Sequence, residues 1–343
     1  MISFHPTITY QTYREALAAP YTPRALARAF RMMFPNHTSI LTDSGRSALA
    51  LIIETLKLRG TRLALPAFLC NVLLPVLRHY DITPVFIDID PKTFEPAPES
   101  YADDFLARVD AVLLVATYGN TIPRASRAKI RNAGKITIED YAHVALPREP
   151  VTTIHGHARY YSLPKTLSVP DGGLAIFHKD VAPPNLPPHT KTPEFFKNCL
   201  KLFNPFTTLV AHLKSLREAR QTTPVWKRIE EPSIITKRLL YYFLYENPPA
   251  EGRRYCYPFI VLNPDSAQQL LLENGIAAER LWLDPIGLFR TYGAYPNTER
   301  AAVSVICAPG WHIHTKEKEK TYLALLKNIL TGQLTHFGDE RKR

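Results

Sequence analysis

The sequence has 343 residues, of which 45% are hydrophobic and 21% charged, and its formal net charge is +11 at pH 7. A chain of this size and composition can bury a large core, which excludes a disordered or fibrous protein and favours a globular one with a large and a smaller domain. The four cysteines form no CxxC pair and no Cys/His ligand pattern, so we expect neither a structural metal nor a disulfide framework.

The excess of basic residues fits three kinds of partner: nucleic acid, an acidic membrane surface or a phosphorylated substrate. We find no nucleic-acid-binding motif and expect no nucleic-acid partner; an ordinary basic surface or attraction of an anionic substrate explains the charge. The first six residues lack the basic-then-apolar pattern of a signal peptide, and the longest clean apolar run, 111–116, is too short to span a bilayer. We therefore expect a cytoplasmic protein without stable membrane insertion.

Helix-like and strand-like segments alternate between residues 39 and 180. Apolar periodicity predicts helices at 48–58, 71–79 and 124–132. Short apolar runs predict strands at 62–65, 84–90, 111–116, 135–138 and 174–177. This alternation predicts an α/β fold with a mostly parallel central sheet and helices on both faces. Ligands of such sheets bind beyond the carboxyl ends of the strands.

The pattern changes after residue 180. A proline-rich run at 181–188 is followed by a helix-like region at 192–246, whose last part, 233–246, is amphipathic, and by a hinge-like segment at 247–252. We expect that amphipathic segment to pack on its own protein or a partner subunit, which is commoner than lying on a membrane.

A strand at 257–262 and a helix at 265–273 follow the hinge-like segment. The predicted domains are therefore 1–247, a large domain with a Pro-rich then helical segment at about 181–247, and 248–343, a smaller C-terminal α+β domain.

Two residues carry the chemistry that the sequence indicates. Lys165 lies in a short loop that begins at Ser162 and is closed by Gly172-Gly173, and a lysine in such a loop can lose its charge and attack an aldehyde. Asp140 follows an apolar strand-like run, where a carboxylate can keep a heterocyclic nitrogen protonated. A lone lysine is usually solvated and a lone aspartate after a strand is usually a helix cap. Together, in this order, they predict a pyridoxal phosphate (PLP) site with a Schiff base on Lys165.

The remaining contacts that PLP needs also have candidates. Residues Ser44, Gly45, Arg46 and Ser47 open a helix, whose backbone N–H groups suit a phosphate, and the Ser162 hydroxyl is a further donor. Two more candidates lie at the same edge of the predicted sheet. Tyr118 follows the strand at 111–116, and His143 can reach the cofactor's oxygen, although a solvent-facing or capping histidine fits the sequence nearly as well.

These segments carry a resemblance to the DegT/DnrJ/StrS sugar aminotransferase family. The matching stretches are residues 42–49, 65–68, 84–90, 118–119, 138–143, 162–165 with 172–173, and, more loosely, parts of 253–325. The resemblance implies a PLP-dependent transferase of fold type I, usually a homodimer with active sites at the subunit interface. It implies transfer of an amino group from an amino acid such as glutamate to a keto-sugar, often nucleotide-linked. It assigns the Schiff base to Lys165, the pyridine contact to Asp140, and phosphate contacts to Gly45, Arg46 and Ser162.

The sequence departs from the family pattern in places. The family commonly has an aromatic ring over the cofactor at the position of Cys70, so either Phe68 substitutes or a thinner contact is used. Arg46 stands where threonine is usual, and His143 where glutamine is frequent. Residues 181–250 do not show the segment that normally reaches into the neighbouring subunit's site. This departure leaves two alternatives open: a PLP-dependent sugar dehydratase or deoxygenase, and a non-catalytic basic binding or regulatory protein on the same fold.

Overall fold

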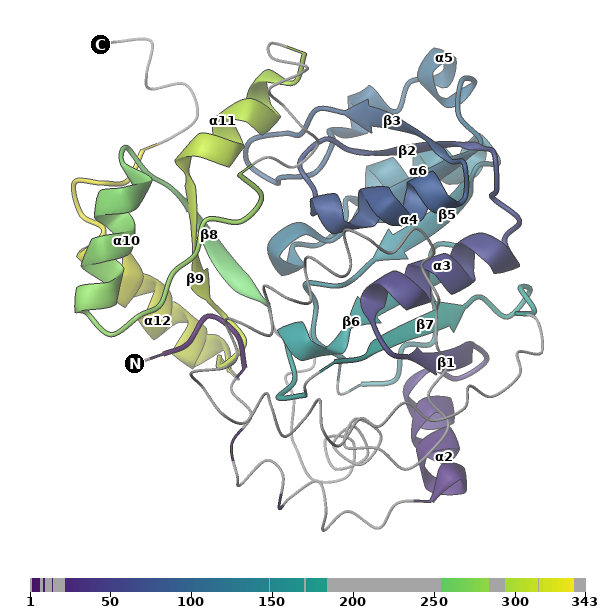
Figure 1. Ribbon diagram of the computed structural model, residues 1–343, viewed down its shortest axis with the longest axis horizontal. Helices are drawn as coiled ribbons and strands as arrows, with labels where there is room; N and C mark the ends of the chain where they lie inside the picture. Colours follow the sequence, from purple (N-terminus) through teal and green to yellow (C-terminus); the bar gives the residue numbers. More distant parts are fainter. Residues whose placement is uncertain are drawn as a thin grey trace.

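The computed structural model describes residues 2–6, 9, 14, 22–147, 149–169, 171–183, 254–283, 294–313 and 315–335. They form a seven-stranded sheet flanked by helices and a smaller unit around a two-stranded sheet (Figure 1). Most of the predicted Pro-rich run, the helix-like region at 192–246 and the hinge-like segment at 247–252 lie outside the described residues. The predicted domain boundary at 247/248 lies outside them too and remains a prediction.

The large sheet has the strand order β1-β7-β6-β5-β4-β2-β3. Its strands are β1 (Thr38–Thr42), β2 (Arg62–Pro66), β3 (Thr83–Ile87), β4 (Ala111–Val115), β5 (Ile136–Asp140), β6 (Ala158–Ser162) and β7 (Gly173–Phe177). Strands β2 to β6 pair in parallel, whereas β7 is antiparallel to both β1 and β6. Strand β7 therefore runs against the other six strands of this sheet, and the prediction of a mostly parallel sheet is confirmed.

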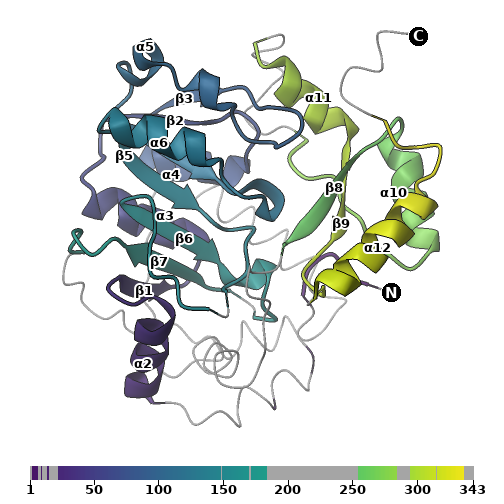
Figure 2. The ribbon, with the colours of Figure 1, turned by 180° about the vertical axis from the view of Figure 1, so that it is seen from behind.

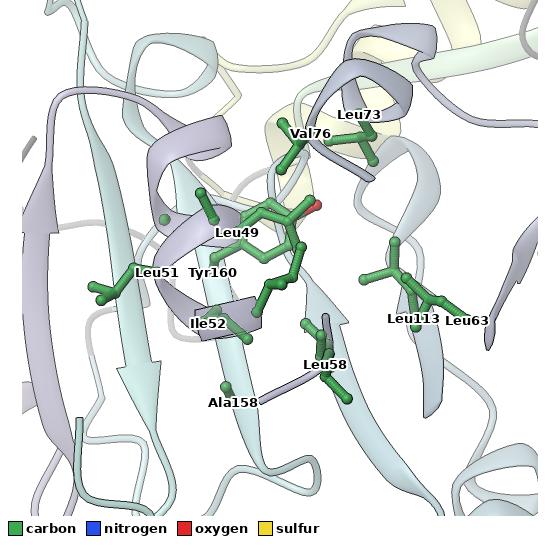
Figure 3. Packing of buried hydrophobic residues seen from close by; sticks show 14 of the residues in the cluster. Leu49, Leu51, Ile52, Leu58, Leu63, Leu73, Val76, Leu113, Ala158 and Tyr160 are labelled. Carbon is green, nitrogen blue, oxygen red and sulfur yellow. The ribbon is translucent and has the colours of Figure 1, made fainter. Parts of the chain in front are cut away.

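Helices cover both faces of the sheet, as predicted. On one face, α3 (Gly45–Thr55) and α4 (Leu74–His79) pack in a cluster that joins Leu49 and Ile52 to Leu113 and Tyr160 of the strands (Figure 3). On the other face lie α2 (Pro23–Met33), α5 (Asp103–Leu106) and α6 (Arg124–Asn132), which Figure 2 shows from behind. Strand β4, Ala-Val-Leu-Leu-Val, is buried at every position, which fits a strand covered on both sides.

Local contacts explain where the observed elements differ from the predicted ones. Helix α3 begins at Gly45 because the Ser44 side chain caps it, accepting the N–H of Ser47 at 3.2 Å. Strand β3 ends at Ile87 because the next carboxylate, that of Asp88, turns away to accept the N–H groups of Asn297 and Thr298 at 3.0 and 2.9 Å. The predicted helix at 71–79 is a 3₁₀ turn, η1 (Asn71–Leu73), followed by α4.

The smaller unit contains β8 (Cys256–Ile260) and β9 (Val305–Pro309), which pair antiparallel, with α10 (Pro264–Glu273), α11 (Pro296–Ser304) and α12 (Lys316–Ile329). Leu271 and Leu326 join α10 and α12 to this sheet in one core cluster. The first residues of the chain pack here as well, because the N–H of Ile2 donates to the carbonyl of Gly275 at 2.7 Å (Figure 1).

Besides the contacts of Asn297 and Thr298 with Asp88, two further hydrogen bonds connect the smaller unit to the edge of the large sheet. The N–H of Tyr255 donates to the carbonyl of His143 at 3.0 Å, and the Arg254 guanidinium donates to Asn120 at 2.7 Å. Among the described helices, none has the length and apolar character needed to cross a membrane.

Candidate active site

A cavity of about 310 Å³ lies at the carboxyl ends of the parallel strands. Most of its wall comes from the segments that follow β1, β2, β5 and β6, and one aromatic side chain comes from the smaller unit. It is lined by Ser44, Gly45, Arg46, Leu69, Cys70, Val72, Leu73, Val115, Asp140, Ala142, His143, Tyr160, Ser162, Pro164, Lys165, Asp171, Gly172 and Trp282. The cavity lies where the sequence analysis placed the ligand site.

Most of the predicted site residues meet on this wall. The cavity is lined by Ser44, Gly45, Arg46, Cys70, Asp140, His143, Ser162 and Lys165, which come from four separate segments of the chain. Lys165 and Asp140 in particular share one cavity, as a PLP site requires.

Three predicted residues, Ser47, Phe68 and Tyr118, do not line the cavity. The Ser47 hydroxyl donates to the carboxylate of Asp43, which turns it away from a ligand. The Phe68 and Tyr118 rings are fully buried in a cluster of aromatic residues, where Phe68 packs edge-on against Trp282 with ring centres 5.1 Å apart. The expectation that Phe68 substitutes for a ring over the cofactor is therefore revised. The Phe68 ring packs against Trp282, which lines the cavity, and does not itself face the cavity.

The turn between β1 and α3 forms one end of the cavity. Its shape depends on Gly173, the first residue of β7, since a Cβ atom there would lie 2.2 Å from the carbonyl oxygen of Ser44. The N–H of Gly172 donates to the carbonyl of Asp43 at 2.9 Å and ties the two segments together. Helix α3 begins at this point, so its first backbone N–H groups and its positive dipole end are available to an anion.

Lys165 enters the cavity from the 3₁₀ turn η4 (Leu163–Lys165), directly after β6. The N–H of Leu163 donates to the carbonyl of Gly172 at 3.0 Å, and the Leu163 side chain is buried. These two contacts fix the position of the turn. The lysine side chain is half-buried, and its Nζ lies 5.6 Å from the centre of the Tyr255 ring. The smaller unit thus supplies, through Tyr255, an aromatic ring near the Lys165 amine.

Asp140 is the last residue of β5 and is almost fully buried, with 6% of its surface exposed. Its Oδ1 accepts the N–H of Ala142 at 2.8 Å, and its Oδ2 accepts the hydroxyl of Tyr160 at 2.5 Å. Burial raises the pKa of the Asp140 carboxyl, while the Tyr160 hydrogen bond, the Lys165 charge and the Ala142 N–H act in the opposite direction. These contacts favour the ionised carboxylate, but burial outweighs them and the pKa of Asp140 is raised above its ordinary value.

His143 has a defined protonation pattern. Its Nδ1 accepts the backbone N–H of Tyr118 at 3.1 Å, and burial, followed by the Lys165 charge, holds its pKa well below the ordinary value. A neutral ring that accepts at Nδ1 carries its proton on Nε2, so His143 is a donor through Nε2. The Trp282 ring stacks on it with centres 5.2 Å apart and planes 13° apart.

Trp282 has a φ of 59°, an uncommon backbone conformation for a bulky residue, which often marks a functional position. Trp282 lies within residues 253–325, the part of the chain that the resemblance matches loosely, and no role was predicted for it. The sequence analysis also did not single out Tyr160, which faces the cavity because it alternates with Arg159 along β6. The alternation of side chains along β6 would have indicated that Tyr160 and Arg159 face opposite sides of the sheet. Residues 158–162 were not predicted as a strand, so this alternation was not used.

The opposite face of the same two strands carries a buried ionic cluster. Glu139 has no exposed surface, and its carboxylate accepts from Arg159 at 2.7 and 2.9 Å and from Arg127 at 3.0 Å. The Arg159 guanidinium also lies 3.9 Å from the centre of the Tyr141 ring. Burial would raise the pKa of Glu139, but the two arginines outweigh it and the pKa is lowered. The cluster and the cavity therefore occupy opposite faces of β5 and β6.

The sheet order, the lysine turn after β6 and the aspartate at the end of β5 give the α/β architecture that the sequence resemblance predicts. Residues 18–157 match the family model of the DegT/DnrJ/EryC1/StrS aminotransferase family, which confirms the resemblance seen in the sequence over that part of the chain. No curated protein sequence matches the chain.

Solved structures support the same fold. One is a protein assigned as a sugar aminotransferase, Spr1654 from Streptococcus pneumoniae in its PMP form, with 16% identity, a TM-score of 0.64, and 96% of this chain and 99% of that chain covered. A second is a DegT/DnrJ/EryC1/StrS aminotransferase from Brucella abortus, with 16% identity, a TM-score of 0.61, and 93% and 94% covered. A third is DesI in the presence of its TDP-sugar product, with 18% identity, a TM-score of 0.60, and 97% and 93% covered.

Proposed function

We propose that the cavity binds PLP and that the protein transfers an amino group from an amino acid, glutamate in the first instance, to a keto-sugar. The observation that carries the proposal is the meeting of Lys165 and Asp140 in one cavity of about 310 Å³ beside the beginning of helix α3. The donor set fits PLP: an amine for the aldehyde, a buried carboxylate for the ring nitrogen, and backbone N–H groups with Ser162 for the phosphate.

When bound, PLP supplies an aldehyde and a protonated ring that withdraws electrons from the substrate. In the proposed function the chain's residues do the rest. Asp140 would hold the proton on the ring nitrogen, and His143, whose Nδ1 accepts from Tyr118, would offer its Nε2–H to the cofactor's oxygen. The Lys165 amine would hold the aldehyde and, as a free amine, could accept and return the proton that amino transfer requires. The α3 end, Arg46 and Ser162 hold the phosphate.

The acceptor class rests on the family match and on one solved relative. DesI, which shares the fold, was crystallised with its TDP-sugar product. A nucleotide-linked keto-sugar carries a diphosphate, and a chain with a net charge of +11 would attract such an anion. We further propose that the protein works as a homodimer in the cytoplasm, as the family pattern implies.

The test begins with the purified full-length protein and added PLP. We expect a visible absorption band from the bound cofactor, and after borohydride reduction and proteolysis the cofactor should be attached to the peptide that contains Lys165. Lys165→Ala should lose both, while a control, Lys179→Ala at an exposed site outside the cavity, should keep both. A wild-type protein that retains no absorption band once the excess PLP has been removed would exclude the proposed function.

A substrate screen then separates amino transfer from its alternatives. With glutamate and a set of nucleotide-linked keto-sugars, the aminotransferase should form 2-oxoglutarate and an amino sugar in equal amounts. Loss of water or oxygen from the sugar without amine formation would favour the dehydratase or deoxygenase. Salt-dependent nucleic-acid binding that Lys165→Ala leaves unchanged, without turnover of any sugar, would favour the binding protein.

A further inference from the structure

Tyr160 and Asp140 are direct neighbours across two strands. In the parallel pairing of β5 with β6, Asp140 is aligned with Tyr160, so both side chains leave the sheet on the same face. The Tyr160 hydroxyl donates to Oδ2 of Asp140 at 2.5 Å. Both residues also line the cavity, although only 1% of the Tyr160 surface and 6% of the Asp140 surface are exposed. The contact is thus shielded from bulk water.

The Tyr160 ring has little freedom to move. It belongs to the core cluster beneath α3, where it packs among Leu49, Ile52 and Ala158, and Figure 3 shows its hydroxyl oxygen at the end directed away from Ala158. A ring held in a close-packed core places its hydroxyl at a fixed point. With Ala142 donating to the other carboxylate oxygen at 2.8 Å, two donors fix the rotation of the Asp140 carboxylate.

The two donors leave the carboxylate able to bind a further group. Each carboxylate oxygen has two acceptor positions, and the structure assigns one protein donor to each oxygen of Asp140. A ring nitrogen that carries a proton can therefore still donate to Asp140. An ionised carboxylate also stabilises the positive charge of the ring, which a neutral carboxyl does not.

We propose that Tyr160 is a positioning residue, whose hydroxyl keeps the Asp140 carboxylate oriented and ionised for the cofactor's ring nitrogen. The inference rests on the proposed PLP function. Burial works against the ionised form of Asp140, and the Tyr160 hydrogen bond is the strongest of the contacts that oppose burial. Neither the sequence motifs nor the resemblance assign a role to this tyrosine.

The main experiment compares Tyr160→Phe with Tyr161→Phe. The control residue is next in the same strand and equally buried, but it faces the other side of the sheet and its hydroxyl lies 3.5 Å from Nη1 of Arg159. A hydrogen bond to a charged group is worth a factor of about 10 to 100. We therefore expect Tyr160→Phe to weaken PLP binding about tenfold, to shift the absorption band of the bound cofactor, and to lower kcat about tenfold with little change in KM.

Tyr161→Phe should leave the cofactor affinity, the absorption band and kcat within about twofold of wild type, since its hydroxyl does not reach the cavity. Equal behaviour of the two variants, with neither showing the spectral shift, would overturn the proposal, because a purely structural tyrosine predicts that result.

A double-mutant cycle tests whether Tyr160 acts through Asp140. In an Asp140→Asn background, where the carboxylate is gone, adding Tyr160→Phe should change PLP affinity and kcat by less than about twofold. A full tenfold further loss in that background would show that the tyrosine acts independently, and the proposal would be wrong.

A third measurement separates this inference from the proposed function. If the wild-type protein fails to bind PLP, the proposed function fails, but the contact can still be followed in the cofactor-free chain by thermal unfolding. Since the hydroxyl favours the ionised carboxylate, Tyr160→Phe should lower Tm more at pH 8 than at pH 4, while Tyr161→Phe lowers it equally at both. A loss that does not depend on pH in either variant would reject the contact between Tyr160 and Asp140.

Discussion

The backbone N–H of Tyr118 donates to Nδ1 of His143 at 3.1 Å, and this single contact decides which end of the imidazole faces outward as a donor. Tyr118 has a φ of 59° within the 3₁₀ turn η3 (Thr117–Gly119) that follows β4. A positive φ is uncommon for a tyrosine. In this conformation the backbone N–H of Tyr118, in the turn after β4, points to His143. Tyr118 was predicted to contact the cofactor, but its ring is buried in the aromatic cluster, and its backbone N–H reaches His143, which lines the cavity.

The first prediction concerns His143. Its replacement by glutamine, which also offers an N–H donor, should keep PLP affinity within about threefold, whereas His143→Leu should weaken it about tenfold. Because burial holds the pKa of His143 well below its ordinary value, the imidazole should stay neutral throughout the range from pH 6 to 8. PLP dissociation constants measured across this range check both points. Equal affinities of the glutamine and leucine variants would contradict the donor role.

The second prediction concerns Gly173. A Cβ atom there would lie 2.2 Å from the Ser44 carbonyl oxygen, so Gly173→Ala must displace the β1–α3 turn. We expect a loss of about 3 kcal/mol or more in stability and weaker binding of inorganic phosphate or PLP. The control is Gly60→Ala, whose φ of 74° strains an alanine but whose Cβ would meet open space. It should cost only about 1 kcal/mol and leave PLP binding unchanged. Urea unfolding and PLP titration measure the two effects, and similar losses in both variants would contradict the steric argument.

The third prediction concerns Glu95, which is 1% exposed. Its Oε1 accepts the N–H of Thr117 at 2.8 Å, and its Oε2 has no hydrogen-bond partner among the described residues. Burial raises the pKa of Glu95 to about 8, with a smaller contribution from the charge of Asp140. The folded state thus favours the protonated form, and the stability it contributes at low pH is lost as the pH rises toward 8.

Glu95→Gln keeps an acceptor for Thr117 but cannot ionise. The variant should match wild type near pH 5 and be more stable than wild type at pH 9, by a few kcal/mol at most. Thermal unfolding of both proteins from pH 5 to 9 measures the difference. A difference that does not change with pH would show that Glu95 does not take up a proton on folding.

The fourth prediction concerns the ionic cluster behind the cavity. Arg159 is 6% exposed and donates twice to the fully buried Glu139. Arg159→Met should cost about 3–5 kcal/mol, because it leaves a buried carboxylate with Arg127 as its remaining ionic partner. Adding Glu139→Gln should recover part of that loss. Chemical denaturation of the single and double variants gives the coupling energy, and strictly additive losses would contradict the pairing.

The sequence predicted the parts of the fold that repeat a local pattern. Helix α6 was placed at 124–132, where the structure has it, and β4 and β2 were placed to within one residue. These elements have continuous apolar or amphipathic patterns of their own. The sequence also brought Lys165, Asp140 and Ser44 to one edge, because parallel strands align their carboxyl ends.

Other elements depend on tertiary contacts and could not be predicted locally. Strand β6, Ala-Arg-Tyr-Tyr-Ser, contains a buried arginine whose charge is paired by Glu139 on β5. Helix α11 begins where Asp88, far away in sequence, accepts its first N–H groups. Phe68 was one of two alternatives for the ring contact, because the family's aromatic position aligns with Cys70. In the structure Phe68 packs instead in the buried aromatic cluster beside Trp282.

The alternation of side chains along β5 and β6 has a consequence for how the site can change. Glu139 and Arg159 are aligned across the two strands, and so are Asp140 and Tyr160. Sliding one strand by a single residue would put a charged side chain of the cluster opposite an active-site residue and separate the buried ion pair. The Glu139–Arg159 ion pair therefore fixes the register of β5 against β6. Substitutions in the cavity wall can therefore change substrate choice without disturbing the sheet only while this ion pair is kept. It lies on the opposite face and prevents β5 and β6 from shifting against each other.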